Sequence, residues 1–453
     1  MTYIASVDVG TTNIKINLFT DTYDVIDAVK YPHTKIYRTD EKFELDLDEI
    51  WGHLMAGLSS LITRNKVEQL EVVLTTAMHS VQLLKDDYSL KGSLITWADK
   101  RGSREIQERS LESLEQQYYR TGTPIHSMNP YFKLLACGED DLSGGALVGS
   151  LKDVLFYRLT GEWVIDLSNA SSGGLLNLAT LAWDSQSLDD IGLIEAQLPV
   201  IQPISYRASA LEAHFEIEVG VVLGTSDGIS SNYTFADLEN VAVLSIGTSH
   251  AVRVIDAKPQ LNAAYQNFAY AINADRYLIG LPSNNGADVL AWANSVFNSS
   301  YAELNEVAMM RPETQSVFIP HLNGERAPVW NEFATGNLLK LSRVSTRESV
   351  LFSVILGMIF NIKHNVDQLA ELVEFEAIGL VGGLTELAAF PQLIADILGY
   401  TIYIPLIKNA ETLGSIAAVK GKTFELEYQV VEPAEDAGYG ELFKEYLELV
   451  SRA

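Results

Sequence analysis

The fold of this chain is decided by the stretch Ala5–Ile16, which reads ASVDVGTTNIKI. A related stretch near the middle of the chain, Leu244–Arg253, reads LSIGTSHAVR, and Gly10 aligns with Gly247. In both copies a β-branched apolar run leads into a Gly-Thr-Thr or Gly-Thr-Ser turn and out into an alternating run. This pattern predicts a strand, a tight turn and a second strand in each copy.

Each turn has the chemistry of a phosphate-binding hairpin. A glycine followed by two hydroxyl residues lets the backbone approach an anion, while successive N–H groups and the hydroxyls of Thr11 and Thr12 supply donors. Only the first copy carries an acid two residues before its glycine, Asp8, where the second has Ser245. A carboxylate beside phosphates suits a bridging metal ion. A single turn of this kind is usually only a turn, and the duplication favours the functional interpretation.

Length and charge limit the architecture and the partners. The 453 residues exceed one ordinary core, and the repeat predicts two domains, residues 1–236 and 237–453. The 32 basic and 59 acidic residues give a net charge of −27, which argues against nucleic-acid or anionic-membrane partners because both need a positive surface. Screening within roughly 8 Å at physiological salt leaves nucleotide recognition to local donors and a metal ion. We therefore expect a small-molecule partner.

Cysteine content and hydropathy predict a cytoplasmic protein. The single cysteine, Cys137, excludes an intrachain disulfide and a cysteine-rich zinc site, and it fits a reducing cytosol. The chain enters a strand almost at once, without a signal-peptide pattern. The most apolar later run, about Val350–Ile362, is predicted to be too short to span a bilayer. The sequence leaves the oligomeric state open, a homodimer included.

Two motifs in the first half carry residues suited to a polyhydroxy substrate. A β-branched strand leads to His79 just past its end, and ligand sites in α/β sheets collect at the carboxyl ends of strands. Ile95–Arg101 (ITWADKR) sets Trp97, Asp99 and Arg101 at alternating positions, which gives an apolar platform with polar groups. For each motif the structural alternative stays open, a satisfied core histidine for the first and an exposed charged loop for the second.

Further candidates come from the junction of the halves and from the second half. Asp227 lies at a Gly-flanked turn after the strand Val221–Gly224, and it is the acid that we expect to act in catalysis. Pro282–Gly286 opens a helix whose N-terminal amides either meet phosphate or only cap the helix. Ala377–Leu384 (AIGLVGGL) is a strand meeting a double-glycine turn. Bare backbone there either admits a flat purine ring or makes a tight connection.

Some segments predict secondary structure only. Helical spacing of apolar residues predicts a core-facing helix over residues 47–62. Ser345 and Glu348 have capping-box spacing, which predicts a buried helix running to about Phe375. Pro199–Ser209 is predicted to be irregular surface.

Taken together, these stretches resemble the FGGY carbohydrate kinases, with matching segments in the same order from Asp8 to Gly414. The duplicated hairpins resemble those of the ATPase fold shared by actin, heat-shock chaperones and sugar kinases. The resemblance implies an α/β, two-domain actin-like ATPase (ribonuclease H-like) fold with a central cleft. It also implies ATP and Mg²⁺ as cofactors, and phosphorylation of an open-chain sugar, polyol or sugar acid.

The motifs and the resemblance together assign roles to residues. Metal binding falls to Asp8 and catalysis to Asp227. The expected substrate-binding residues are Met78, His79, Trp97, Asp99, Arg101 and Asp227. The expected nucleotide-binding residues are Thr11, Thr12, Lys15, Gly247, Thr248, Asn285, Gly382 and Gly383.

Within the family, the motif wording is most similar to that of gluconate kinases. The segments that carry this similarity are Ala77–Val81, Ile95–Asp99, Thr121–His126 and Ser226–Gly228. The similarity implies D-gluconate as substrate and 6-phosphogluconate as product, with Arg101 and Lys133 as candidates for the carboxylate. Xylulose kinase or another polyol kinase is the nearest alternative, and an actin-like nucleotide switch without sugar turnover is an alternative of another class. One departure from the family is His250, where relatives usually carry glycine.

Overall fold

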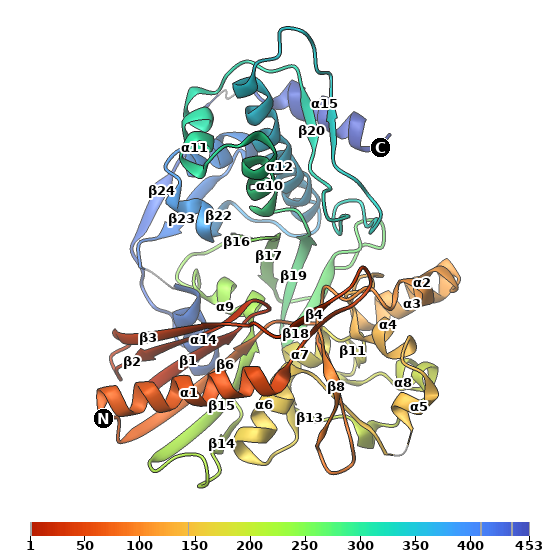
Figure 1. Cartoon of the computed structure of the whole chain (residues 1–453), viewed down its shortest axis with the longest axis vertical. Helices are drawn as coiled ribbons and strands as arrows, with labels where there is room; N and C mark the ends of the chain where they lie inside the picture. The colour runs from red at the N-terminus through yellow and green to blue at the C-terminus, as the bar shows by residue number, and fades with distance from the viewer. Residues whose placement is uncertain (1, 144, 408–409, 436–437, 453) are drawn as a thin grey trace.

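The chain forms two halves, one above the other, in the computed structural model (Figure 1). The described residues are 2–143, 145–407, 410–435 and 438–452. Each half has its own sheet and its own apolar core. Val7 and Leu74 lie in the first core, and Leu244 and Leu380 lie in the second.

The first sheet has the strand order β14-β15-β6-β1-β2-β3. Its strands are β1 (Tyr3–Val9), β2 (Asn13–Phe19), β3 (Val25–Pro32), β6 (Gln69–Thr76), β14 (Arg207–Ser209) and β15 (Glu218–Ser226). Strand β1 pairs antiparallel with β2 and parallel with β6, which in turn pairs parallel with β15. The carboxyl ends of β1, β6 and β15 therefore meet at one edge, where ligand sites of such sheets lie.

The second sheet repeats this pattern in the order β18-β19-β17-β16-β22-β23-β24. Its strands are β16 (Val241–Ile246), β17 (His250–Asp256), β18 (Phe268–Asn273), β19 (Arg276–Ser283), β22 (Ala377–Val381), β23 (Thr401–Pro405) and β24 (Tyr428–Val431). Strand β16 pairs antiparallel with β17 and parallel with β22, which pairs parallel with β23. The predicted duplication and the two-domain, actin-like α/β fold are confirmed.

Smaller sheets decorate the two halves. One has the order β4-β5-β8-β7-β9. Its strands are β4 (Ile36–Arg38), β5 (Phe43–Leu45), β7 (Val81–Leu84), β8 (Leu90–Ile95) and β9 (Leu147–Gly149). Short pairs join β10 (Val164–Asp166) to β13 (Val200–Gln202), β11 (Leu176–Asn177) to β12 (Ala182–Trp183), and β20 (Val317–Ile319) to β21 (Asn337–Leu339). The prediction of irregular structure over Pro199–Ser209 is wrong in part, because β13 pairs with the distant strand β10 and β14 pairs with the next strand, β15.

Helices pack on the sheets and fill the spaces between them (Figure 1). They are α1 (Leu47–Asn65), α2 (Ser103–Gln107), α3 (Leu111–Thr121), α4 (Pro130–Leu135), α5 (Glu139–Leu142), α6 (Leu151–Thr160), α7 (Leu167–Ser171), α8 (Ser185–Ile191), α9 (Asp227–Tyr233), α10 (Asp288–Phe297), α11 (Tyr301–Met310), α12 (Arg347–Ala370), α13 (Phe390–Leu398), α14 (Ala410–Lys420) and α15 (Gly440–Val450), with 3-10 turns at Glu195–Gln197 and Gly383–Glu386. Helix α1 confirms the prediction for residues 47–62. Its N-cap, Asp46, accepts the amide of Glu49.

Helix α12 is the central helix of the second core. Thr346 rather than Ser345 is its N-cap, and it ends at Ala370 rather than near Phe375. By length and composition it is long and apolar enough to cross a membrane, with a mean hydropathy of 1.4 in its best window. The helix is therefore longer than the apolar run Val350–Ile362 of the sequence analysis, because residues on both sides of that run, such as Asn365, belong to the same helix. That window is 83% buried inside the protein, as expected of a core helix.

Helix α14 comes from the second half of the sequence but packs on the first sheet. Its Leu413, Ile416 and Val419 form one apolar cluster with Ile4 and Phe19 of the first sheet, among others. In addition, the hydroxyl of Ser6 donates to the carbonyl oxygen of Thr412 at 3.0 Å. The division at residues 236 and 237 stays a prediction, and this helix crosses it in space.

Candidate active site

The two hairpins lie at the same place in the two sheets. The amide of Gly10 donates to the carbonyl of Asn13 at 3.0 Å, and that of Gly247 donates to the carbonyl of Ser249 at 2.9 Å. The first turn is longer by one residue, since its closing pair is Val9 and Ile14 whereas that of the second is Ile246 and His250. A Cβ built on either glycine would meet nothing closer than 3.5 Å. Both turns therefore leave room for an anion to approach the backbone.

The hydroxyl residues of the first turn differ in their surroundings. Thr12 is exposed, and its hydroxyl accepts from the side chain of Asn13. Thr11 is half-buried, and its hydroxyl accepts from Trp97 Nε1 at 2.9 Å. Thr11, predicted to bind phosphate, and Trp97, predicted to bind substrate, are thus in direct contact. The predicted phosphate site and the predicted substrate site therefore adjoin each other.

The second hairpin is supported by the start of α10. The amides of Gly286 and Ala287 donate to the carbonyl oxygens of Thr248 and Gly247, at 3.0 and 2.8 Å. These amides are therefore engaged by the hairpin rather than free to meet phosphate. Of the two alternatives for this helix start, the structure favours the structural one.

Asn285 and His250 lie beneath this hairpin rather than on its open side. Asn285 is fully buried, and its side chain donates to the carbonyl of Gly324 and accepts the amide of Leu322. A direct contact of Asn285 with nucleotide stays a prediction, which this burial disfavours. His250 bonds through its two ring nitrogens to the carbonyl of Asn285 and the side chain of Asn365. Burial lowers the pKa of His250 to about 3, so the ring is neutral.

The two glycines predicted to face adenosine differ. Gly382 has φ 112°, and a Cβ there would collide with the carbonyl of Ile246 at the end of β16. Gly382 therefore serves the tight connection after β22. Gly383 has nothing within 4 Å of an added Cβ, so its backbone is open on one side. Contact of either residue with a purine ring stays a prediction.

The acids of the site gather where β1 and β15 end. Asp8 is the penultimate residue of β1, and Asp227 begins α9 directly after β15. Burial, opposed by the charge of Lys15 and assisted by the charges of Asp227 and Glu411, raises the pKa of Asp8 to about 7. Burial also raises the pKa of Asp227, and Arg253 opposes this shift most strongly. Crowded carboxylates of this kind favour a cation between them.

This donor set fits a magnesium ion held largely by nucleotide phosphates and water. Among the described residues, no group of three or more His, Cys, Asp or Glu side chains is placed to hold a metal by itself. Mg²⁺ commonly uses one or two protein carboxylates together with substrate phosphates. Asp8 is in position to be such a carboxylate.

Lys152 of α6 fixes the strand that carries Asp227. Its ammonium is fully buried and donates to the carbonyl oxygens of Leu74, Leu223 and Thr225, each at 2.8 Å. Two of these carbonyls belong to β15, one of them next to a bulge in its pairing with β6. Burial lowers the pKa of Lys152 to about 8. The sequence analysis did not identify this residue, because its partners are more than seventy positions away.

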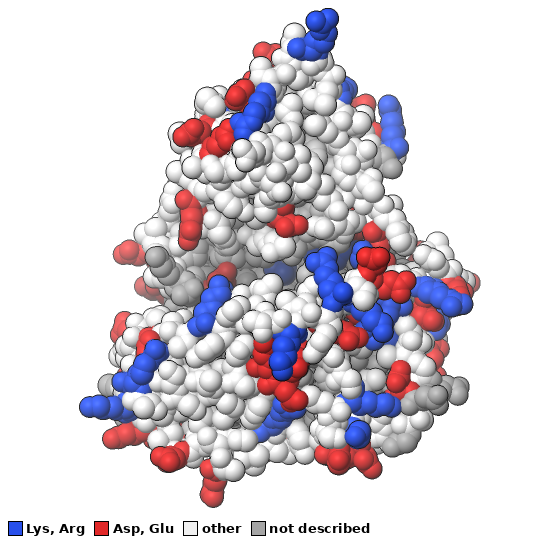
Figure 2. All heavy atoms as spheres, in the orientation of Figure 1, with Lys and Arg blue, Asp and Glu red and all other residues white. Residues whose placement is uncertain are grey.

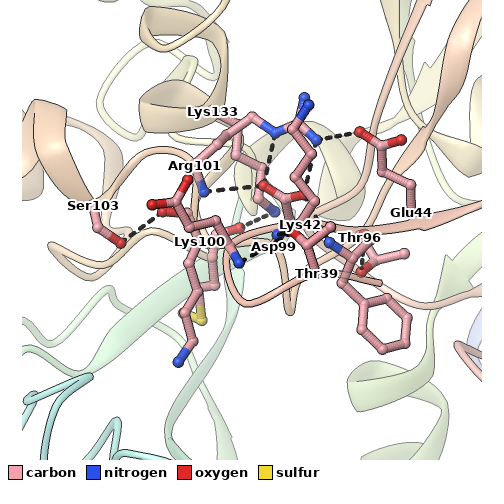
Figure 3. Close-up of polar contacts among 12 residues, drawn as sticks. Thr39, Lys42, Glu44, Thr96, Asp99, Lys100, Arg101, Ser103 and Lys133 are labelled. Atoms are coloured by element: carbon pink, nitrogen blue, oxygen red, sulfur yellow. Dashed lines mark hydrogen bonds and ion pairs between the residues drawn. The ribbon is translucent and has the colours of Figure 1, made fainter. Parts of the chain in front are cut away.

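Asp99 and Arg101 form a closed ionic cluster (Figure 3). The carboxylate of Asp99 is fully buried and accepts from the amide of Phe43 and from Arg101, at 2.9 and 2.7 Å. Arg101 also pairs with Glu44. Although burial acts to raise it, these bonds hold the pKa of Asp99 below its usual value. The structure thus gives both residues partners within the protein, which disfavours them as hydroxyl and carboxylate ligands, and their contact with substrate stays a prediction.

Lys133 is likewise engaged. Its fully buried ammonium donates to the carbonyl oxygens of His79 and Met128, at 2.8 and 2.7 Å. It therefore holds the loop of His79, whose backbone has φ 64°. Burial lowers the pKa of Lys133 to about 7. The expectation that Lys133 receives a substrate carboxylate is disfavoured for the same reason as that for Arg101.

His79 remains a good hydrogen-bond partner for a substrate. Its Nδ1 donates to the carbonyl of Ser172 at 2.9 Å, and its Nε2 faces the hydroxyl of Tyr270 at 3.4 Å. Burial lowers the pKa of His79 to about 3, and Lys133 adds to the lowering. The ring is therefore neutral with Nε2 as an acceptor. Met78 precedes it, buried in a cluster with Tyr270.

Several side chains that the sequence analysis did not assign to the substrate also lie near His79 and Trp97, and most of them come from the second half. Arg253, Tyr270 and Arg326 come from β17, β18 and the loop after β20, and His126 comes from the first half. The guanidinium of Arg326 lies 4.9 Å from the centre of the Trp97 ring. Figure 2 shows the surface hollowed at the waist between the two halves. The sequence marks Arg326 only through its neighbour Glu325, a dipeptide that is equally compatible with a structural ion pair.

Comparison with known proteins agrees with this geometry. Residues 3–232 match the N-terminal domain of the FGGY family of carbohydrate kinases, and residues 242–419 match its C-terminal domain. A gluconokinase of Bacillus licheniformis is 29% identical over 445 residues, covering 91% of this chain and 86% of its own. A solved xylulose kinase of Lactobacillus acidophilus has a TM-score of 0.94 at 27% identity, and a gluconate kinase of that organism 0.93 at 27%. Each of these two structures covers 100% of this chain and 98% of its own.

Proposed function

This chain belongs to the FGGY family of carbohydrate kinases, and from that premise we propose that it transfers the γ-phosphoryl group of ATP to the 6-hydroxyl of D-gluconate. The observation that carries the choice of gluconate is the similarity to the Bacillus gluconokinase along almost the whole chain. Family membership makes the protein a phosphotransferase, so the alternative of a nucleotide switch is set aside. Xylulose remains the second candidate, because the xylulose kinase structure is as similar as that of the gluconate kinase.

The proposed roles follow from the geometry of the hairpins and acids. Asp227 accepts the proton of the attacking hydroxyl, and its position at the end of β15 is fixed through Lys152. The open turns at Gly10 and Gly247 hold phosphates with backbone amides and hydroxyls. Asp8 holds the magnesium ion, which neutralises charge on the phosphates when bound. Phosphoryl transfer has a loose transition state, so the protein contributes mainly position and electrostatics.

The acceptor lies beside the first hairpin, since Trp97 contacts Thr11. Neutral His79 accepts a hydrogen bond from a substrate hydroxyl through Nε2, and the Trp97 ring gives the carbon chain an apolar face. Because both halves supply phosphate hairpins and acceptor residues, we place the transfer in the hollow at the waist between them (Figure 2). We propose that the protein works in the cytoplasm on this small molecule, with Mg²⁺-ATP.

A panel of acceptors tests the proposal. Purified protein with ATP and MgCl₂ is assayed on D-gluconate, D-xylulose, glycerol and D-glucitol, and the site of phosphorylation is determined by NMR. We expect kcat/KM for gluconate to exceed that for xylulose by at least about 100-fold, which corresponds to roughly 2.7 kcal/mol. A preference for xylulose would sink the gluconate assignment and leave the kinase intact.

A further inference from the structure

Two arginines beside the candidate site residues lack a carboxylate partner: Arg326 covers Trp97, and Arg253 lies near Gly228. Two other recessed arginines have one: Arg120 pairs with Asp184 at 3.1 Å, and Arg101 pairs with Asp99 at 2.7 Å. Over the described part of the chain, no Asp or Glu oxygen lies within 4.0 Å of a guanidinium nitrogen of Arg253 or Arg326. In a protein with a net charge of −27, two such unpaired cations are unusual.

Arg326 is almost completely buried, with 7% of its surface exposed. Its Nη2 donates to the carbonyl of Ser283 at 2.9 Å, its Nη1 lies 3.5 Å from Met128 Sδ, and its face covers Trp97. Its Nε is buried and has no hydrogen-bond partner. A buried donor of this kind costs free energy until a ligand satisfies it.

Arg253 lies beside the segment that begins with Asp227. Its Nη1 donates to the hydroxyl of Ser245 at 2.7 Å, and its Nε is also buried without a partner. A Cβ built on Gly228 would lie 3.0 Å from this Nε and 3.3 Å from Met78 Cε. Arg253 therefore lies among residues predicted for catalysis and for substrate binding.

The neighbouring acid is not available to either arginine. The carboxylate of Glu325 accepts the amides of Asn284 and Arg326, each within 2.9 Å. It also accepts the side-chain amides of Asn285 and Asn361, each at 2.8 Å. Glu325 thus fixes the loop of Arg326 while its oxygens are saturated. The guanidinium is held in place before any ligand arrives, which is the condition for selective binding.

The positive charges of Arg253 and Arg326 repel each other. Burial lowers the pKa of Arg326 to about 10, the charges of Glu325 and Asp227 oppose this shift, and the positive charge of Arg253 adds to it. An anion bound between them would relieve this repulsion and satisfy the free donors through charge-assisted hydrogen bonds. Arg101 and Lys133, the candidates from the sequence, are already neutralised or saturated by the protein.

We propose that Arg253 and Arg326 form the anion-binding end of the acceptor site and bind the carboxylate of an open-chain sugar acid. This inference rests on the proposed function, and it names the two residues that select an aldonate over a neutral polyol or ketose. The two guanidinium charges, which a neutral substrate leaves without an anionic partner, provide the discrimination.

The test compares ligands that differ only at the acid end. Binding of D-gluconate and of D-glucitol, in which an alcohol replaces the carboxylate, is measured by calorimetry without nucleotide for wild type, Arg326→Met and Arg253→Met. We expect each substitution to weaken gluconate binding by about 100-fold or more, equivalent to roughly 2.7 kcal/mol, and glucitol binding by less than about threefold. Arg326→Lys, which keeps the charge and loses the fork, is expected to lose an intermediate amount.

Controls separate this inference from the proposed function. Arg158→Met removes an arginine that pairs with Asp48 far from the hollow, and it should change neither affinity. Thermal unfolding verifies that each variant is folded. Equal losses for gluconate and glucitol overturn the proposal, as does equal loss of kcat with every acceptor, which would place the arginines on the transferred phosphoryl group. If wild type does not phosphorylate gluconate but binds other aldonates more tightly than their alditols through these arginines, the proposed function fails and the subsite stands.

Discussion

The two hairpins share a backbone and differ in charge. In the first, Asp8 stands two residues before Gly10, and in the second Ser245 stands two residues before Gly247. Asp8 lies among other acids, whereas the hydroxyl of Ser245 accepts from Arg253. The same contrast holds at the end of the sheets, because β15 leads into Asp227 while its counterpart β23 ends at Pro405 without an acid. A duplicated fold has thus been divided into an acidic side suited to a cation and a basic side suited to an anion.

The largest effect is expected from the acid that has no counterpart in the second half. Asp227→Asn should lower kcat by roughly 100-fold or more and leave ATP affinity largely unchanged, because in the proposed mechanism the residue receives the proton of the acceptor and does not hold the nucleotide. Steady-state kinetics and nucleotide titration measure both quantities. Asp189→Asn, at an exposed position, is the control. Near-normal turnover of Asp227→Asn would remove this residue from the mechanism.

The matched pair Asp8 and Ser245 tests the division of charge directly. Asp8→Ala should shift the Mg²⁺ concentration for half-maximal activity upward by about 10-fold to 100-fold, because a ligand of the ion is lost. Ser245→Ala should leave that midpoint unchanged, although it releases Arg253. The measurement is a magnesium titration of initial rate at saturating ATP. Equal shifts for the two variants would show that the hairpins do not differ in this respect.

Thr248 probes the phosphate contact that both hairpins share. Thr248→Val keeps the shape of the side chain and removes one donor, so nucleotide binding should weaken by about 1 to 3 kcal/mol. The equivalent change in the first copy, Thr11→Val, should also disturb Trp97, whose Nε1 donates to this hydroxyl. Calorimetry with Mg²⁺-ATP, together with tryptophan fluorescence, separates the two effects. Wild-type affinity in both variants would contradict the phosphate-binding role.

The smallest effect concerns pH and is confined to the first hairpin. The pKa of Asp8 is raised to about 7, and a metal ion binds the deprotonated carboxylate in competition with the proton. Mg²⁺ affinity should therefore rise with pH, by about threefold between pH 6.5 and 7.5, as the deprotonated fraction grows. Asp8→Asn should abolish this slope. A magnesium midpoint in wild type that does not move over this range would contradict the shifted pKa.

Local sequence signals were sufficient for the architecture and for the positions of the acids. The repeat of Gly10 at Gly247 is visible as a strand-turn-strand pattern within about a dozen residues. Such a pattern is set by local side-chain alternation and turn residues. Asp227 was recognisable because it follows an apolar strand directly. The domain duplication followed from these short segments.

The state of each charged side chain was not visible in the sequence. Arg101 looked free, yet it pairs with Glu44, a residue 57 positions away. Arg253 looked like an ordinary alternating strand residue, yet its Nε is buried without a hydrogen-bond partner. This environment exists only in the folded protein, where β17 lies against Gly228. Whether a buried charge is neutralised depends on such long-range contacts. The spacing of residues along the chain does not encode them in a readable form.

The position of α14 also sets the order in which the parts of the protein can fold during synthesis on the ribosome. The seven-residue cluster that joins this helix to the first sheet includes Val73 and Val222, synthesised long before Ile416. Roughly 180 more residues must follow the first half before the helix emerges, which takes about 10 to 40 seconds at typical elongation rates. During that interval the first sheet presents an uncovered apolar face. A nascent chain stalled before residue 410 should therefore expose the apolar side chains of Val73 and Val222 and lack Glu411, whose charge acts on Asp8.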